Sequence, residues 1–218
     1  MPRQTRNAKK LIYVFCEGES EQVYTKFLKE TFQNVAIINY PSATGLFDDA
    51  KSKFEKDKKY KSKAEVTDEI WFFFDTERTD VDKWEKRFKI IKELRKLRKD
   101  AKIKVRLLMT TACIEYWLML HYKKFSPYIE TVAQKENMLA EVVKKVPEYE
   151  KGDYNSTAKI AINYPTAVVN AQGVFRSLLQ DGLPSLEDTD QRNEWLYKSS
   201  KTFSTVFEAI QFLESLSN

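Results

Sequence analysis

Apolar and polar positions alternate along the chain in a pattern that predicts strands and helices in turn. Residues 10–16 are mostly aliphatic or aromatic and suit a strand, and the run stops abruptly at Glu17-Gly18. Apolar residues then recur with helical spacing from 19 to 32. Further strands are predicted at 35–40, 69–75 and 102–110, and further helices at 46–61 and 81–99. This order predicts an α/β fold with a four-stranded, mainly parallel sheet flanked by helices.

Beyond residue 110 the pattern predicts helices only. Residues 113–122 are apolar nearly all round, which is typical of a buried helix. Other helices are predicted at 134–145, 157–181 and 202–216, and an acidic, polar loop at 185–193. We therefore expect a sheet domain over 8–112 and an all-helical C-terminal extension over 113–218, packed together as one structural unit.

The amino-acid composition is that of an ordinary globular protein and does not by itself indicate a function. The chain has 218 residues, 42% of them hydrophobic and 32% charged, and a net charge of +5, which permits binding to a polyanion without demanding it. No apolar run reaches the roughly 18 residues that span a membrane, and residues 1–9 predict a flexible basic arm rather than a signal peptide. We expect a cytoplasmic protein in which Cys16 and Cys113 are buried, reduced thiols. The single histidine excludes a His-rich zinc site.

Acidic residues follow two of the predicted strands at the point where each strand ends. Glu17 follows the first strand, and Asp75 and Glu77 follow the continuous apolar run of the third. If these strands are parallel neighbours, the three carboxylates meet at one sheet edge, where like charges need a cation or a shared proton. Oxygen ligands suit Mg²⁺ or Mn²⁺. The alternative is a set of solvated turn acids.

Other polar residues near these strand ends allow two interpretations each. Asp80 is either the cap of the following helix or a metal ligand, and Glu19 and Glu21 are either charges of a helix start or, for Glu19, within reach of the metal. Glu115 lies within an apolar helix and needs a partner, either as a metal ligand or general base or in a salt bridge. His121 is either a hydrogen-bonded structural imidazole or a phosphate contact or proton shuttle.

Two basic tracts, residues 51–63 and 86–99, are candidates for contact with nucleic acid. Charge runs of this kind are most often solvated helix faces, and the alternative is contact with phosphate groups, which would make binding strongly dependent on salt. Within the second tract, Arg87, Arg95 and Lys99 are the candidate nucleic-acid-binding residues.

The order of strands and acids resembles the Toprim fold, the catalytic domain shared by topoisomerases, bacterial primases and OLD-family nucleases. In that fold a Glu after the first strand and an Asp-x-Asp after the third bind divalent metal. Glu17 and Asp75 match the first two acids, and Glu77 stands where a second Asp is usual. The resemblance covers about residues 8–112 and implies Mg²⁺ or Mn²⁺ as cofactor.

A narrower resemblance joins two segments of the chain. Residues 14–24, with their Cys-Glu-Gly-Glu turn, and residues 110–122 are similar to the RloB-like family. The matching residues of the second segment are Cys113, Glu115, Trp117, Leu118, Leu120 and His121. Ile114 replaces the usual aromatic residue, and Thr111-Ala112 replaces a preceding Asn-Pro. The resemblance implies a Toprim nuclease of restriction and phage-defence loci, an antiviral, abortive-infection setting in which an ATPase gene often lies alongside.

The leading hypothesis is a Mg²⁺- or Mn²⁺-dependent nuclease that acts on DNA or RNA. Glu17, Asp75 and Glu77 would hold the metal, and Glu17, Asp75 and Glu115 would be the catalytic residues. One alternative is a non-catalytic adaptor that binds nucleic acid or an ATPase partner, its acids being structural. Another is a Toprim nucleotidyl transferase, which would use the same metal on a different substrate.

Overall fold

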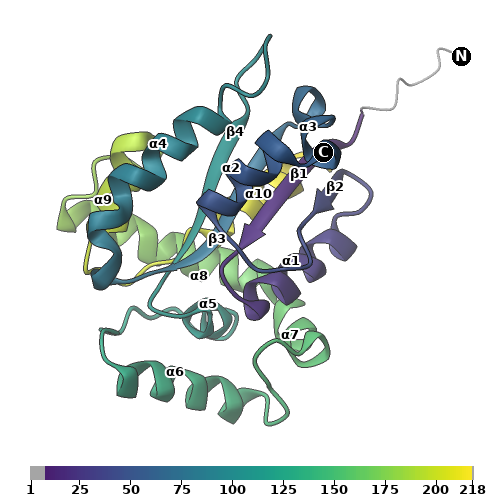
Figure 1. Cartoon of the computed structure of the whole chain (residues 1–218). Helices are drawn as coiled ribbons and strands as arrows, with labels where there is room; N and C mark the ends of the chain where they lie inside the picture. The colour runs from purple at the N-terminus through teal and green to yellow at the C-terminus, as the bar shows by residue number, and fades with distance from the viewer. Residues whose placement is uncertain (1–7, 218) are drawn as a thin grey trace, which may run out of the picture.

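A four-stranded parallel sheet forms the centre of the molecule (Figure 1). The computed structural model describes residues 8–217, so most of the predicted basic arm lies outside the described residues. The strands are β1 (Lys10–Cys16), β2 (Ala36–Asn39), β3 (Glu69–Thr76) and β4 (Lys104–Thr111). They lie in the order β2-β1-β3-β4, and every pair of neighbours is parallel. The predicted α/β fold with a four-stranded sheet flanked by helices is confirmed.

Alternate side chains of the strands pack against helices on opposite faces of the sheet, as the period of a strand requires. On one face Phe72 stacks on Phe47 with ring centroids 4.1 Å apart. On the other face Phe73 meets Tyr24 edge-on at 6.1 Å. The helices that cover the sheet are α1 (Glu19–Thr31), α2 (Phe47–Lys56), α4 (Trp84–Leu94) and α10 (Val206–Ser215). Since both faces are covered, the strands are apolar nearly throughout.

The connections that follow β1 and β3 lead to opposite edges of the sheet. After β1 the chain runs outward to β2 by way of α1, and after β3 it runs to β4 on the other side by way of α4. Tyr24 of α1 packs on one face of the sheet, while Arg87 of α4 lies over Phe74 on the opposite face. The two connections therefore part at the carboxyl ends of β1 and β3. In open α/β sheets such a switch point is where ligands bind.

The second half of the chain packs around the carboxyl ends of the strands. The helices are α5 (Ile114–Leu120), α6 (Val132–Lys145), α7 (Tyr154–Ala161), α8 (Tyr164–Ser177) and α9 (Asp190–Lys198). Every residue of α5 is buried, as its apolar sequence predicts. In Figure 1, α5 and α6 lie below the arrowheads of the strands, and α7 lies beside α1. The helical part thus forms one wall of the sheet edge that carries the acids.

Several helix boundaries differ from the prediction for identifiable local reasons. The helix predicted at 46–61 is two helices, α2 and α3 (Lys58–Lys61), because the side chain of Asp57 accepts a hydrogen bond from the Lys59 amide at 2.8 Å and starts the second. The helix predicted at 157–181 is also divided, because α7 ends at Ala161 and α8 begins at Tyr164. Pro165 lies in the first turn of α8, a position that tolerates proline because no amide hydrogen is needed there.

The helix predicted at 81–99 and the loop predicted at 185–193 also differ from the structure. Residues Arg78–Lys83 form a 3₁₀ helix, and α4 follows from Trp84, so the prediction that Asp80 caps this helix is wrong. Within the predicted loop, the hydroxyl of Thr189 accepts a hydrogen bond from the Arg192 amide at 3.2 Å and starts α9. A polar capping group thus sets the start of α9, whereas α4 begins without a side-chain cap, and apolar spacing reveals neither boundary.

The helix predicted at 202–216 begins only at Val206, because the preceding residues pair with the edge of β4. The amide of Thr111 donates to the carbonyl of Phe203 at 3.0 Å, and the amide of Thr205 donates to the carbonyl of Met109 at 2.8 Å. The hydroxyl of Thr205 also accepts from the Met109 amide at 2.8 Å. The C-terminal segment therefore covers the outer edge of the sheet.

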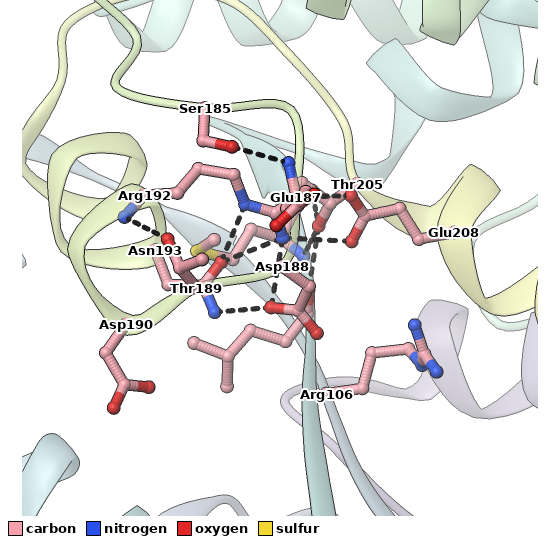
Figure 2. Close-up of polar contacts among 12 residues, drawn as sticks. Arg106, Ser185, Glu187, Asp188, Thr189, Asp190, Arg192, Asn193, Thr205 and Glu208 are labelled. Atoms are coloured by element: carbon pink, nitrogen blue, oxygen red, sulfur yellow. Dashed lines mark hydrogen bonds and ion pairs between the residues drawn. The ribbon is translucent and has the colours of Figure 1, made fainter.

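A cluster of buried charged side chains joins α10 to α9 (Figure 2). The guanidinium of Arg192 is almost fully buried and contacts both oxygens of Glu208, at 2.5 and 3.1 Å. It also donates to Asp188 at 3.1 Å, and Asp188 in turn pairs with Lys104 at the start of β4, at 2.6 Å. Burial raises the pKa of Glu208, and the nearby Arg192 opposes the shift. The cluster ties α9, α10 and the sheet together.

Both cysteines are free and buried, as predicted. The thiol of Cys16 lies 3.4 Å from the hydroxyl of Thr25, and burial raises the pKa of each thiol to about 12. Among the helices of residues 8–217, none is both long and apolar enough to cross a membrane.

Candidate functional site

The carboxylate of Glu17 is fixed to the strand that carries the second predicted acid. Its Oε2 accepts a hydrogen bond from the backbone amide of Asp75 at 2.9 Å, and its own amide donates to Phe73 at 3.0 Å. These contacts continue the pairing of β1 and β3 past the end of β1. Burial raises the pKa of Glu17, and the Asp75 amide opposes the shift. Glu17 and Asp75 therefore meet at the switch point, as the sequence predicts.

A solvent-accessible hollow of about 320 Å³ lies at this sheet edge. It is bounded by the turn after β1, the ends of β3 and β4, the start of α5, and two lysines from the helical part. The lining residues are Glu17, Gly18, Glu19, Ser20, Glu21, Asp75, Glu77, Ala112, Cys113, Ile114, Glu115, Lys135 and Lys151. Five of the predicted site residues, Glu17, Glu19, Asp75, Glu77 and Glu115, thus gather in one place.

Besides Glu17, two further acids in the hollow have raised pKa values and so hold protons more tightly than free carboxylates do. Burial raises the pKa of Asp75 well above its ordinary value, and the charges of Glu21 and Glu17 add to the shift. Burial likewise raises the pKa of Glu21 to about 7, with Glu17 contributing. The Oδ1 atom of Asp75 is buried without a hydrogen-bond partner among the described residues. Unmatched buried oxygens of this kind favour either a proton or a cation.

Glu115 enters the hollow from the first turn of α5 and is completely buried. Its Oε1 lies 3.1 Å from the ammonium of Lys151 and accepts a hydrogen bond from the Tyr149 hydroxyl at 3.3 Å. Its Oε2 has no hydrogen-bond partner within residues 8–217. The predicted need for a partner is therefore met by a salt bridge on one side only, and the second oxygen remains available.

The turn that directs α5 toward the hollow is strained. Ala112 has φ of 66°, a left-handed conformation that a non-glycine residue rarely adopts, and a hydrogen bond of 2.8 Å from the Cys113 amide to the Thr111 carbonyl closes the turn. The amide of Ala112 donates to Thr76 at the end of β3, at 3.0 Å. Backbone strain of this kind concentrates at functional sites, and here it sets the direction in which Glu115 approaches the acids.

Glu77 and Glu19 lie at the rim of the hollow. Glu77 is partly exposed and forms an ion pair with Lys135 of α6, and its other oxygen accepts from the Thr79 hydroxyl at 3.3 Å. Glu19 packs beside Gly152, where an added Cβ would approach its Oε2 to 3.1 Å. Glu77 thus lines the same hollow as the other acids, and its charge is balanced by Lys135.

Asp80 and His121, the other two predicted support residues, lie outside the hollow. Asp80 pairs with Lys83 at 2.7 Å and with Arg87 at 2.9 Å. The Nδ1 of His121 donates to the Trp117 carbonyl at 3.0 Å, and Nε2 lies 3.1 Å from the Tyr24 hydroxyl. Burial lowers the pKa of His121 to about 4. Its contacts are those of a neutral structural imidazole.

The three predicted nucleic-acid-binding residues do not gather at the hollow. Arg87 is mostly buried, with its guanidinium 5.3 Å from the ring centre of Phe47 and a similar distance from two other aromatic rings. Arg95 forms two hydrogen bonds to Asp190, at 2.9 and 2.7 Å. Lys99 is exposed and belongs to the connection between α4 and β4. This connection lies at the amino end of the sheet, opposite the ends that carry the acids (Figure 1). Two of the three thus have internal partners.

The structure adds three residues to the site that the sequence did not single out. Glu21 is buried, and its spacing from Tyr24 and Leu28 on the inner face of α1 is the signal that could have shown it. Lys135 and Lys151 come from α6 and from the loop between α6 and α7. No sequence signal separates these two from the other lysines, because long-range packing alone brings them to the acids.

The hollow is lined mainly by carboxylates, the type of ligand that hard divalent cations prefer. One carboxylate oxygen each of Asp75 and Glu115 is buried without a hydrogen-bond partner among the described residues. As positioned, no three His, Cys, Asp or Glu side chains within residues 8–217 form a group able to hold a metal ion. Binding would therefore require side-chain rotations, above all release of Glu77 and Glu115 from their lysines.

The fold and the site define an α/β protein with a carboxylate-lined edge at its switch point. The model of the family described as "RloB-like protein" matches residues 12–213, nearly the whole chain. The chain belongs to the RloB-like family. No curated protein and no solved structure matches the chain.

Proposed function

We propose that the protein is a metal-dependent nuclease that hydrolyses phosphodiester bonds of nucleic acid. The observation that carries this proposal concerns Asp75 and Glu115, two residues that line the hollow. Each has one buried carboxylate oxygen without a hydrogen-bond partner in the described part of the chain. Leaving such groups unmatched is costly unless a cation or proton satisfies them. Membership of the RloB-like family and the resemblance to Toprim nucleases agree with the proposal.

Glu17, Asp75 and Glu77 would hold Mg²⁺ or Mn²⁺, with Glu115 in support. When bound, the ion polarises the scissile phosphate and lowers the pKa of an attacking water. The chain itself fixes Glu17 through the Asp75 amide and holds Glu115 at the end of a strained turn. The raised pKa of Glu21, about 7, places a proton in the hollow near neutral pH when no cation is bound. Cation binding should therefore release protons.

The test is cleavage of DNA and RNA in the presence of Mn²⁺ by wild type and by Glu17→Gln. We expect the substitution to lower the cleavage rate by about a hundredfold or more, the scale on which a single catalytic side chain acts. The matched control is Glu136→Gln, which removes an exposed carboxylate from α6 and should leave the rate unchanged. Equal activity of wild type and Glu17→Gln would refute the proposal.

A non-catalytic adaptor is the second candidate, and one observation favours it. Glu77 and Glu115 already carry lysine partners, so part of the acidic charge is balanced without a metal. Such an adaptor would bind nucleic acid or an ATPase partner. Calorimetric titration with Mn²⁺ separates the two candidates, since an adaptor with structural acids would bind no metal. Nucleotide incorporation on a single-stranded template would instead indicate a nucleotidyl transferase.

The setting we propose is the reducing cytoplasm, in keeping with two free, buried thiols. A role in antiviral defence, beside an ATPase, follows from the family resemblance and is part of the same proposal.

A further inference from the structure

Two ammonium groups from the helical part of the chain enter the acidic hollow. Lys135, in the first turns of α6, forms an ion pair with Glu77. Lys151, in the loop between α6 and α7, lies 3.1 Å from Oε1 of the buried Glu115. The side chain of Lys135 is 30% exposed and that of Lys151 is 57% exposed. Both groups therefore contact an acid of the site and remain open to solvent.

The surrounding structure holds both lysines in place. Gly152 adopts a left-handed conformation with φ of 77° and packs against Glu19, while the Tyr149 hydroxyl binds Glu115, so the loop is fixed on both sides of Lys151. The start of α6 is set by a capping box between Thr131 and Gln134, just before Lys135. An ion pair of 2.8 Å between Arg78 and Glu130 ties this end of α6 to the segment after β3. The capped start of α6 and the turn at Gly152 thus hold the two lysines at the hollow.

The charges in the hollow show what the lysines do when a cation is absent. Six acids line it, Glu17, Glu19, Glu21, Asp75, Glu77 and Glu115, against the two lysines and no arginine. The lysines partly balance the charge of the acids. A divalent cation held by the same carboxylates would supply that charge itself and leave the ammonium groups without a partner. A phosphodiester brought to the cation carries negative charge to the same place.

We propose that Lys135 and Lys151 bind the phosphate groups of nucleic acid, and that they exchange their carboxylate partners for phosphate when a divalent cation enters the hollow. This inference rests on the proposed function, because it takes nucleic acid as the substrate. It places the phosphate contacts on the helical part of the chain, at the carboxyl edge of the sheet, and away from Arg87, Arg95 and Lys99. Lysine suits this role because its compact charge sits on a long, flexible stem.

The test is the salt dependence of binding to a fluorescently labelled single-stranded oligonucleotide, as DNA and as RNA, with Ca²⁺ present. Each phosphate contact that is lost should reduce the slope of log K against log[salt] by about 0.7 for a single strand. Lys135→Met and Lys151→Met should each show this reduction and bind several-fold more weakly. Lys144→Met is the matched control, since it removes the same charge from α6 where the lysine pairs with Glu141 outside the hollow.

A purely structural role would give a different result. If the lysines only balance the acids, their removal would lower the melting temperature and change Mn²⁺ affinity, yet leave the salt slope as in wild type. That outcome, or absence of oligonucleotide binding by the wild type, overturns the inference. Lys151→Arg restores the charge and should restore the slope. Should Lys151→Met unfold because Glu115 is left unpaired, the double variant Lys151→Met/Glu115→Gln removes both charges and keeps the test valid.

The inference and the proposed function fail in distinguishable ways. A wild-type protein that binds the oligonucleotide with lysine-dependent salt slopes, but does not cleave it with Mn²⁺, would refute the nuclease and support the phosphate contacts. A protein that cleaves, loses activity in Glu17→Gln, and shows unchanged slopes in both lysine variants would support the nuclease and refute the phosphate contacts.

Discussion

Glu17 and Asp75 are joined by a hydrogen bond of 2.9 Å between the side chain of the first and the backbone amide of the second. The bond extends the pairing of β1 and β3 by one step, using a side-chain oxygen in place of a carbonyl. It holds Glu17 in position whether or not its carboxylate has another ligand. The contribution of Glu17 to the fold can therefore be separated from its contribution to chemistry.

The two roles of Glu17 should respond differently to two substitutions. In Glu17→Gln the amide oxygen can still accept from Asp75, so the free energy of unfolding should stay close to that of wild type. In Glu17→Ala the Asp75 amide loses its acceptor, and we expect a loss of about 1 kcal/mol. Urea denaturation measures both values. A Gln variant as unstable as the Ala variant would show that the charge, and not the hydrogen bond, stabilises this edge.

Divalent cations should stabilise the folded protein through the hollow. An ion that binds only the folded state at about one hundred times its dissociation constant adds about 2.7 kcal/mol. We therefore expect Mn²⁺ to raise the melting temperature of wild type, and to raise it much less in Asp75→Asn. Thermal unfolding with and without Mn²⁺ measures the effect. Equal shifts in wild type and Asp75→Asn would place any bound ion elsewhere.

His121 should make stability depend on pH in a defined window. Burial lowers its folded-state pKa to about 4, whereas the unfolded chain takes up a proton near 6.5. Between these values the unfolded state binds more protons, so the contribution of His121 to stability is complete above pH 6.5 and falls as the pH is lowered toward 4. At pH 5 the expected loss is about 2 kcal/mol.

The variant His121→Gln isolates this contribution, because glutamine does not titrate while its amide can donate and accept hydrogen bonds. Urea denaturation at pH 7.5 and pH 5 should show a smaller acid-induced loss in the variant than in wild type. Parallel losses in the two proteins would mean that His121 is accessible to protons in the folded state.

Gly152 should be essential for presenting Lys151. An added Cβ at its φ of 77° is strained, and it would also crowd the carboxylate of Glu19 at 3.1 Å. We expect Gly152→Ala to lower stability by about 1 kcal/mol or more and to weaken oligonucleotide binding without altering any charge. The control is Gly173→Ala within α8, where the new methyl meets only the flexible end of Lys124 and helix propensity improves. Denaturation and fluorescence anisotropy provide the two readouts.

The buried guanidinium of Arg192 should matter for stability and not for the site. Arg192→Met would leave the buried Glu208 without its partner and remove one of the partners of Asp188, a loss that typically costs about 3–5 kcal/mol. Arg176→Met removes an exposed arginine from α8 and should change stability by less than about 0.5 kcal/mol. Calorimetry compares the two variants. Provided that Arg192→Met still folds, its response to Mn²⁺ should match that of wild type.

The sequence predicts the sheet well because strand and helix periods differ and the strands are covered on both faces. The apolar run ending at Asp75 and the abrupt stop at Glu17 identify two strand ends, and parallel pairing brings them together. The helix boundaries are less predictable. Asp57, Thr189 and Pro165 set them through capping or the lack of an amide hydrogen, effects that apolar spacing does not include.

The sequence did not predict which basic side chains pair with the acids of the site. Glu115 needed a partner by physical argument, and the structure supplies two, Lys151 and Tyr149. Both come from a loop that is distant in sequence, since Tyr149 lies 34 residues beyond Glu115. Arg87 was a candidate for contact with phosphate, yet its guanidinium packs among aromatic rings beside Asp80. Which lysine or arginine faces solvent and which is internal depends on tertiary packing.

The pairing of Phe203 and Thr205 with β4 has a consequence for synthesis of the chain. β4 is complete by residue 111, but the segment that covers its outer side is made about ninety residues later, since Phe203 and its partner Thr111 are 92 residues apart. A nascent or prematurely terminated chain would therefore display a bare row of amides and carbonyls able to recruit a strand from another molecule. The edge of the sheet is therefore closed only once residues 203–205 have been made.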